Sequence, residues 1–126
     1  MERTFTSTIK ESSRELTAKE KVKFKDVSNA LRLDEVTETS EHVVIAPDFY
    51  VVLSIHNEKA DNKDYDQYVI VDKEGTKYVT SSTSFWNSFY DIFSDMAEVD
   101  EDWEIEVLKK PSTNYKGKYF LTCALL

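Results

Sequence analysis

The sequence is poor in the residues that build covalent, metal and phosphate sites, with one cysteine, two histidines and two glycines among 126 residues. A lone cysteine, Cys123, excludes an internal disulfide and a zinc site built from cysteines, and suits a reducing compartment. Gly75 and Gly117 are too few glycines for a loop that cradles phosphates. His42 and His56 lie far apart and belong to no catalytic motif. We therefore expect no enzyme, no metal site and no cofactor.

Long apolar runs are also absent. Every such run is far shorter than the ~20 residues needed to span a bilayer, and the first residues lack the apolar stretch of a secretory signal. The final residues, Cys-Ala-Leu-Leu, match a prenylation motif, but Cys123 is expected inside a strand, where a transferase cannot reach it. These features predict a soluble protein of the cytoplasm with no membrane contact.

Charge is unevenly distributed along this acidic chain. The 16 basic and 24 acidic residues give a formal charge of −8, and such a surface repels the phosphates of duplex DNA and of anionic lipids at long range. Residues 109–120 nevertheless contain four lysines and no carboxylate, whereas residues 91–106 contain eight carboxylates and no basic residue. Any contact with nucleic acid is therefore expected to be local.

From Pro47 onward the hydrophobic pattern predicts a barrel-like domain. Alternating apolar residues predict strands, Gly75 supplies a tight turn between two of them, and a 3.6-residue period after several serine and threonine N-cap candidates predicts a helix. Five aromatic and aliphatic side chains are expected to be largely buried: Trp86, Phe89, Phe93, Trp103 and Ile105. The predicted elements are strands at residues 49–56, 66–71, 76–81, 103–110 and 118–125, and a helix at residues 85–97.

The first 46 residues are harder to interpret. Thr17 and Glu20 have the spacing of a capping box, and Phe24 and Val27 continue a helical period, which favours a helix from about Ala18. A strand is the alternative, because lysines alternate with other residues over residues 19–26 and would share one face of an extended segment. We expect residues 1–46 to form a partly helical extension packed on a domain of residues 47–126.

Five strands with a helix between the third and fourth is the order of the OB-fold, a small five-stranded barrel. The fold class is therefore expected to be mainly β, with one or two helices. OB-folds bind oligonucleotides through strands two and three and through the loops that join strands one to two and four to five. In this chain those loops are residues 57–65 and 111–117, and each contains lysine and tyrosine.

Proteins that bind single-stranded nucleic acid combine cations that follow the phosphates with aromatic rings on which bases stack. Tyrosines also fill cores and are common in strands, so the prediction depends on their clustering beside lysine-bearing loops; Tyr115, inside the basic loop, is expected to be the main stacking residue. The candidate cations are Lys59, Lys63, Lys77, Lys109, Lys110, Lys116 and Lys118, and the candidate aromatic residues are Tyr65, Tyr68, Tyr78, Tyr115 and Tyr119.

Three short segments, Glu58-Lys59, residues 75–80 and residues 110–118 followed by Phe120-Leu121-Thr122, resemble a known family. They are similar to small single-stranded DNA-binding proteins of bacteriophages that infect Gram-positive bacteria. The resemblance covers about residues 47–126. It implies an OB-fold that coats DNA exposed in replication and recombination in the bacterial cytoplasm, with replication or recombination proteins as partners. Further copies of the chain are a separate candidate partner. Better-known members recruit partner enzymes through a flexible acidic tail, whereas this sequence ends with apolar residues. Only the carboxylates of residues 98–106 are candidates for that role here.

A second function of a different class stays open. The charge of −8 favours an acidic protein-binding module, for example a phage inhibitor that occupies the DNA groove of a host enzyme with its carboxylates. The segregated basic loop favours binding of single-stranded DNA without strong sequence preference. The two hypotheses differ in whether the protein itself binds an oligonucleotide.

Overall fold

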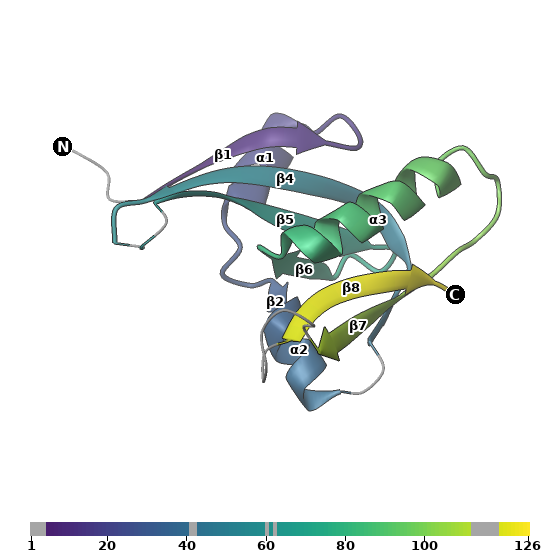
Figure 1. Ribbon diagram of the computed structural model, residues 1–126. Coiled ribbons are helices and arrows are strands. Elements are labelled where there is room, and N and C mark those ends of the chain that lie inside the picture. The colour runs from purple at the N-terminus through teal and green to yellow at the C-terminus, as the bar shows by residue number, and fades with distance from the viewer. Residues whose placement is uncertain (1–4, 41–42, 60, 62, 112–118) are drawn as a thin grey trace. The chain divides into compact units, whose positions relative to one another are not determined.

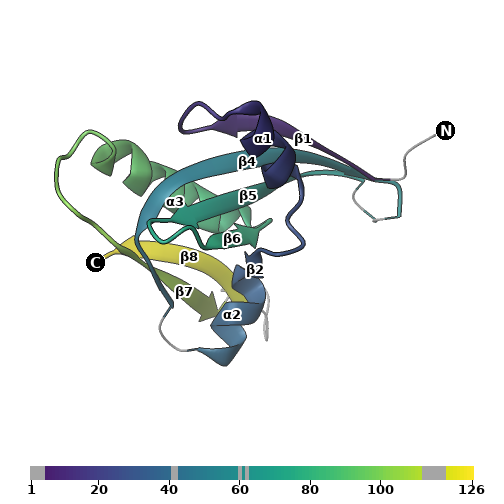
Figure 2. The same cartoon turned by 180° about the vertical axis from the view of Figure 1, so that it is seen from behind.

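The computed structural model describes residues 5–40, 43–59, 61, 63–111 and 119–126, and within them the fold is mainly β with three helices (Figures 1 and 2). The strands are β1 (Phe5–Ser12), β2 (Leu31–Arg32), β3 (Val43–Ile45), β4 (Pro47–Asn57), β5 (Asp64–Asp72), β6 (Lys77–Thr80), β7 (Ile105–Pro111) and β8 (Tyr119–Leu125). The helices are α1 (Ala18–Lys25), α2 (Leu33–Thr39) and α3 (Thr83–Met96).

The strands form two sheets. One contains five strands in the order β1-β4-β5-β6-β2, and the other contains three in the order β3-β7-β8. The prediction of a mainly β fold, with a helix between the third and fourth predicted strands, is confirmed by α3 between β6 and β7. Within the described residues no closed barrel is found, so the finer prediction of a five-stranded barrel is not confirmed.

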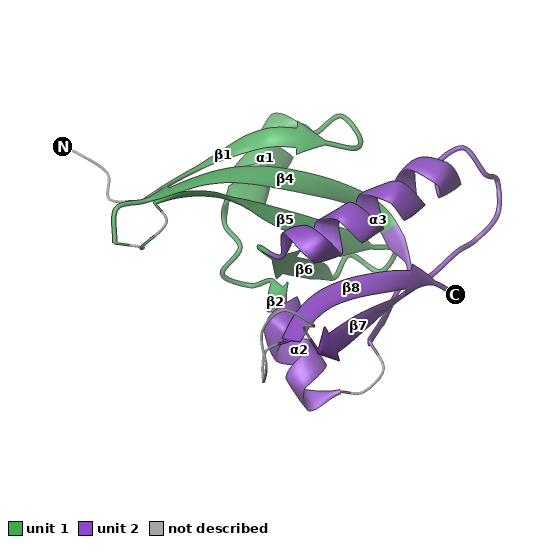
Figure 3. Ribbon diagram, in the orientation of Figure 1, with its two compact units in different colours: residues 1–31, 48–81 green, residues 32–47, 82–126 purple. Residues whose placement is uncertain are grey.

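The chain divides into two compact units (Figure 3). Unit 1 comprises residues 1–31 and 48–81, and unit 2 comprises residues 32–47 and 82–126. This division does not coincide with the expected boundary between residues 46 and 47. The reason is that β1 pairs antiparallel along most of β4, from Phe5 opposite Asn57 to Ser12 opposite Val51, which makes the N-terminal segment an edge strand of the larger sheet.

The core of unit 1 lies on one face of its sheet. Phe49, Val51, Leu53 and Ile55 alternate along β4 and are buried together with Phe24 of α1 and with valines of β5 and β6. The alternation of apolar residues that predicts a strand at residues 49–56 is therefore confirmed. Tyr50 and Val52, on its opposite face, are also buried, so β4 is covered on both faces. Figure 2 shows α1 lying across β1, β4 and β5.

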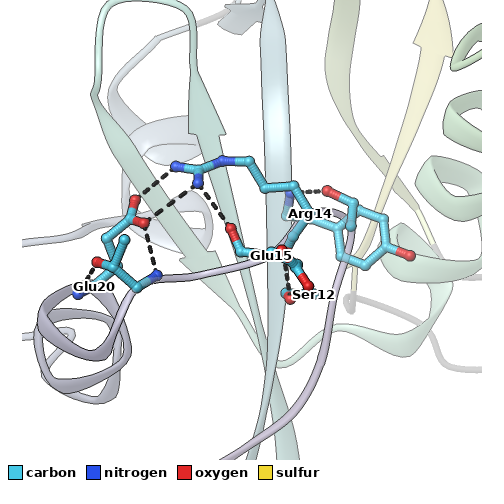
Figure 4. Close-up of polar contacts among 7 residues, drawn as sticks. Ser12, Arg14, Glu15 and Glu20 are labelled. Carbon is cyan, nitrogen blue, oxygen red and sulfur yellow. Dashed lines mark hydrogen bonds and ion pairs between the residues drawn. The ribbon is translucent and has the colours of Figure 1, made fainter.

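The loop from β1 into α1 is held by polar contacts (Figure 4). The Thr17 hydroxyl accepts a hydrogen bond from the Glu20 amide, and the Glu20 carboxylate accepts one from the Thr17 amide, which is the predicted capping box. Arg14 Nη2 donates to Glu20 Oε2 at 2.7 Å, and the guanidinium lies 3.8 Å from the Phe49 ring centre. The helix is confirmed, and the alternative of a strand at residues 19–26 is wrong because these contacts and the burial of Phe24 stabilise the helix.

Unit 2 places α3 beside β8. Ser82 caps α3 by accepting a hydrogen bond from the Phe85 amide. Ser84 Oγ then donates to the Leu121 carbonyl at 2.7 Å, and the hydroxyls of Ser88 and Thr122 are 2.8 Å apart. The Ser84 hydroxyl thus supplies a partner for the Leu121 carbonyl of the edge strand β8. Unpaired backbone N–H and C=O groups of an edge strand are otherwise open to pairing with another chain.

Burial on α3 and β7 differs in part from expectation. Phe89 and Ile105 are fully buried, as predicted, whereas Trp86, Phe93 and Trp103 are only half-buried. Together with Phe89, these three rings form a ladder in which neighbouring ring centres lie under 6 Å apart, from Trp86 through Phe89 and Phe93 to Trp103. The rings shield one another, so a wide aromatic stripe on a helix does not require each ring to lie in the core.

Candidate nucleic-acid interface

The end of the β7–β8 hairpin combines exposed lysines with exposed aromatic rings. Lys110 lies directly opposite Phe120, and Pro111 lies opposite Tyr119. Both lysines of β7, Lys109 and Lys110, are exposed, as are Phe120 (39%) and Tyr119 (62%). Residues directly opposite in an antiparallel pair share a face and neighbouring pairs alternate, so each face of the hairpin end carries one lysine and one aromatic ring.

Lys109 and Lys110 differ in their surroundings. Lys109 Nζ lies 3.7 Å from Glu38 Oε1 of α2, and its stem lines a depression of about 250 Å³ together with Thr37, Ser40, Val107 and Leu108. Lys110 forms no ion pair with any residue in the described ranges. Lys110 is therefore the better placed of the two for an external phosphate.

The predicted residues Tyr115, Lys116 and Lys118 lie outside the described residues. Phe120, by contrast, was not among the predicted site residues. It was interpreted as part of an ordinary strand because apolar residues alternate through residues 118–125. The available signal was strand alternation. Neighbouring residues of a strand point to opposite faces, so a core position for Leu121 predicts that Phe120 points outward, and Leu121 is indeed buried.

The second candidate loop is the β4–β5 connection, where His56 lies between two carboxylates. His56 Nδ1 is 2.7 Å from Asp64 Oδ1 and Nε2 is 2.6 Å from Glu58 Oε1. Lys63 Nζ is 3.2 Å from the other oxygen of Glu58, so the predicted cation Lys63 is already paired. Lys59 is exposed on the turn, and its amide donates to the Asn57 side chain.

The two carboxylate contacts of His56 fit the protonated form of its ring. Only the protonated ring can donate from both nitrogens to two carboxylates, and hydrogen bonds to Asp64 and Glu58 raise the pKa of His56 above its ordinary 6.5. A raised folded-state pKa stabilises this loop below pH 6.5 and loses that effect as pH rises through the folded pKa. An NMR titration should give a His56 pKa above 6.5 that returns toward 6.5 in Asp64→Asn/Glu58→Gln; a wild-type value at or below 6.5 would contradict the arrangement.

The predicted tyrosines of unit 1 are mostly covered. Tyr68 is buried and Tyr78 half-buried, and burial is the main cause that raises the pKa of both phenols above 10. Tyr65 packs on the core cluster of unit 1. Lys77 Nζ lies 5.0 Å from the ring centre of Phe24, at cation–π distance. The structure therefore presents Tyr119 as the one strongly exposed tyrosine among the predicted site residues that it describes.

Charge divides unevenly between the units. Unit 1 has 11 basic and 12 acidic residues and unit 2 has 5 basic and 12 acidic residues, which gives formal charges of −1 and −7. The lysines of the β7–β8 hairpin therefore stand in the strongly acidic unit, while four exposed lysines of α1 lie in the nearly neutral unit.

Four further findings concern metal binding, membrane spanning, the cysteine and relationships to known proteins. No group of three or more histidine, cysteine, aspartate or glutamate residues in the described ranges is placed to hold a metal ion. Among the helices described, none has both the length and the apolar character needed to cross a membrane. Cys123 is buried in β8, which raises the pKa of its thiol to about 12. No family model, curated protein or solved structure matches the chain.

Proposed function

We propose that the protein binds single-stranded DNA without strong sequence preference, using the exposed end of the β7–β8 hairpin. The observation that carries this proposal is the pairing of Lys110 with Phe120, beside the 62% exposed Tyr119. Stacking on aromatic rings contributes about 1–3 kcal/mol per base and tolerates any base. Lysine ammonium groups bind the phosphates and release counterions. Binding is therefore an equilibrium process with no covalent step.

The order of elements supports an OB-like arrangement of β4, β5, β6, β7 and β8 as part of this proposal. β4, β5 and β6 are neighbours in chain order, α3 follows, and β7 pairs antiparallel with β8. Ala46 alone separates β3, which pairs with β7, from β4, which neighbours β5. One nearly continuous segment thus contributes strands to both sheets, and the OB-fold is a partly open barrel.

The resemblance to phage proteins extends the proposal to a biological setting. We propose that the protein coats single strands exposed during phage DNA replication and recombination in the cytoplasm of the bacterial host.

A salt titration of oligo-dT binding tests the proposal. Wild-type affinity should fall steeply as salt rises, and Lys110→Glu should weaken binding and lower the slope of log affinity against log salt by about 0.7 for each phosphate that the variant no longer binds. Lys73→Glu, an exposed lysine of the β5–β6 turn, makes the same charge change outside both candidate loops. An unchanged slope in Lys110→Glu, or an equal change in Lys73→Glu, would show that DNA does not bind at this hairpin.

The formal charge of −7 on unit 2 favours the second candidate, an acidic module that occupies the DNA groove of a host enzyme. The same titration separates the two functions. An inhibitor of this kind should bind little oligonucleotide even at low salt, where long-range repulsion between carboxylates and phosphates is strongest. It should also compete with DNA for a host DNA-processing enzyme, whereas a coating protein should compete with that enzyme for the DNA.

A further inference from the structure

Helix α1 presents an exposed face that is apolar at its centre and basic at its rim. Val22 is 70% exposed, and with Ala18, Lys19 and Lys23 it lines a shallow, almost wholly apolar depression of about 360 Å³. Lys21 and Lys25 are exposed as well. The face is a surface of unit 1 alone.

The geometry of this face is set by contacts on its other side. Phe24 packs edge-to-face on Phe49 with ring centres 5.5 Å apart, so α1 is anchored with the remaining residues outward. The one carboxylate of α1, Glu20, pairs with Arg14 in the preceding loop (Figure 4). None of the four lysines forms an ion pair with a residue of the described part of the chain. The positive charge of the face is therefore not neutralised from within unit 1.

The chemistry of the face favours an acidic protein segment over nucleic acid. Binding of unpaired bases needs exposed aromatic rings, and the single ring of α1, that of Phe24, is buried. The centre of the face is aliphatic instead. An occupant should therefore carry a small apolar side chain surrounded by carboxylates.

The chain itself contains such a segment in unit 2. Residues 95–101 span the end of α3 at Met96 and include Asp95, Glu98, Asp100 and Glu101, all exposed. Val99 stands among them, 43% exposed, on a turn closed by a hydrogen bond of 3.1 Å from its amide to the Met96 carbonyl. Four carboxylates around a valine thus complement four lysines around a valine.

We propose that the exposed face of α1 docks residues 95–101 of a second copy of this chain. The contact joins two different surfaces, so association can continue head to tail, or it can close as a ring or as a dimer in which both contacts are made reciprocally. This inference goes beyond the proposed function, because it requires no DNA. On a single strand, the same contact between neighbouring copies would make coating cooperative.

Sedimentation velocity without DNA tests the contact. Association should grow with protein concentration at an ionic strength near 0.01 M, where the Debye length is about 30 Å, and weaken at 0.15 M, where it is about 8 Å. Lys19→Glu/Lys23→Glu should weaken association by at least about tenfold, as should Asp95→Lys/Glu98→Lys, because each opposes like charges. Mixing the two variants should restore association, since each then meets a partner of opposite sign.

Lys59→Glu/Lys73→Glu is the matched control, with the same charge change on exposed lysines outside α1, and it should associate like the wild type. A wild type that stays monomeric at low salt would overturn the proposal, and so would a mixture that fails to associate. A charge effect independent of concentration would indicate a contact within one chain and also overturn it. If Lys19→Glu/Lys23→Glu instead weakens binding to an oligonucleotide too short for two copies, the face holds nucleic acid and the proposal fails.

Discussion

Phe89→Ala is expected to lower the free energy of unfolding by about 3–5 kcal/mol. Phe89 is completely buried near the middle of α3, and its ring centre lies within 6 Å of those of Phe85, Trp86 and Phe93. Truncation removes the transfer free energy of the ring and leaves a cavity that its aromatic neighbours fill only in part. Phe89→Leu keeps more of the volume and should cost clearly less.

Urea unfolding measures this effect, and the chain offers a convenient probe. Both tryptophans, Trp86 and Trp103, belong to unit 2, so tryptophan fluorescence reports that unit while circular dichroism reports strands of both. Asn87→Ala, on the exposed side of α3, should change stability by less than about 0.5 kcal/mol. If Phe89→Ala shifts the fluorescence transition no more than Asn87→Ala does, Phe89 does not support the fold as argued.

Local pattern was enough to predict most of the elements. Strands β4 to β8 and helix α3 begin and end within a few residues of their predicted positions, because alternation of apolar residues and the serine cap of α3 are local signals. The capping box likewise placed the start of α1 at Ala18. These elements have in common a period or a cap that can be seen within a dozen residues.

The elements missed by the sequence depend on distant partners. β1 has a mostly polar sequence and contains a bulge at Lys10, and it is a strand because β4 supplies its hydrogen bonds some forty residues away. α2 begins at the fully buried Leu33, and its N-cap residue, Arg32, makes no side-chain cap. The sequence before Leu33 therefore contains no cap signal that would have predicted this helix. The grouping of residues 1–31 with residues 48–81 follows from such pairings, and none of them leaves a local mark.

The candidate site was predictable in composition but not in exposure. β5 is buried on both faces from Gln67 to Val71, so no alternation of polar residues indicated that Tyr68 points inward. Pairing of charges was equally hidden, since Lys63 meets Glu58 only because the hairpin brings them together. Tyr119 and Phe120 could be ranked above the other rings only once the pairing of β7 with β8 placed them at the end of the hairpin where β7 ends and β8 begins.

Tyr119→Ala is expected to weaken binding to oligo-dT by about 1–3 kcal/mol, a rise in Kd of roughly 5- to 150-fold. The ring is 62% exposed, so little of its surface supports the fold, and it shares a face with Lys109, two pairs along the hairpin. A base stacked on Tyr119 would keep its phosphate within reach of that lysine. Tyr119→Phe should bind nearly as tightly as the wild type, because stacking requires the ring and not the hydroxyl.

Phe120→Ala should show the same loss on the opposite face of the hairpin, and the double variant should approach the sum, because the two rings would hold different bases. Fluorescence titration with oligo-dT and thermal unfolding on the same samples separate binding from folding. A structural role would lower the Tm of Tyr119→Ala and leave its affinity intact at temperatures where it stays folded. That result would show that DNA does not bind at the described end of the hairpin. A reduced affinity with an unchanged Tm would instead identify Tyr119 as a residue on which bases stack.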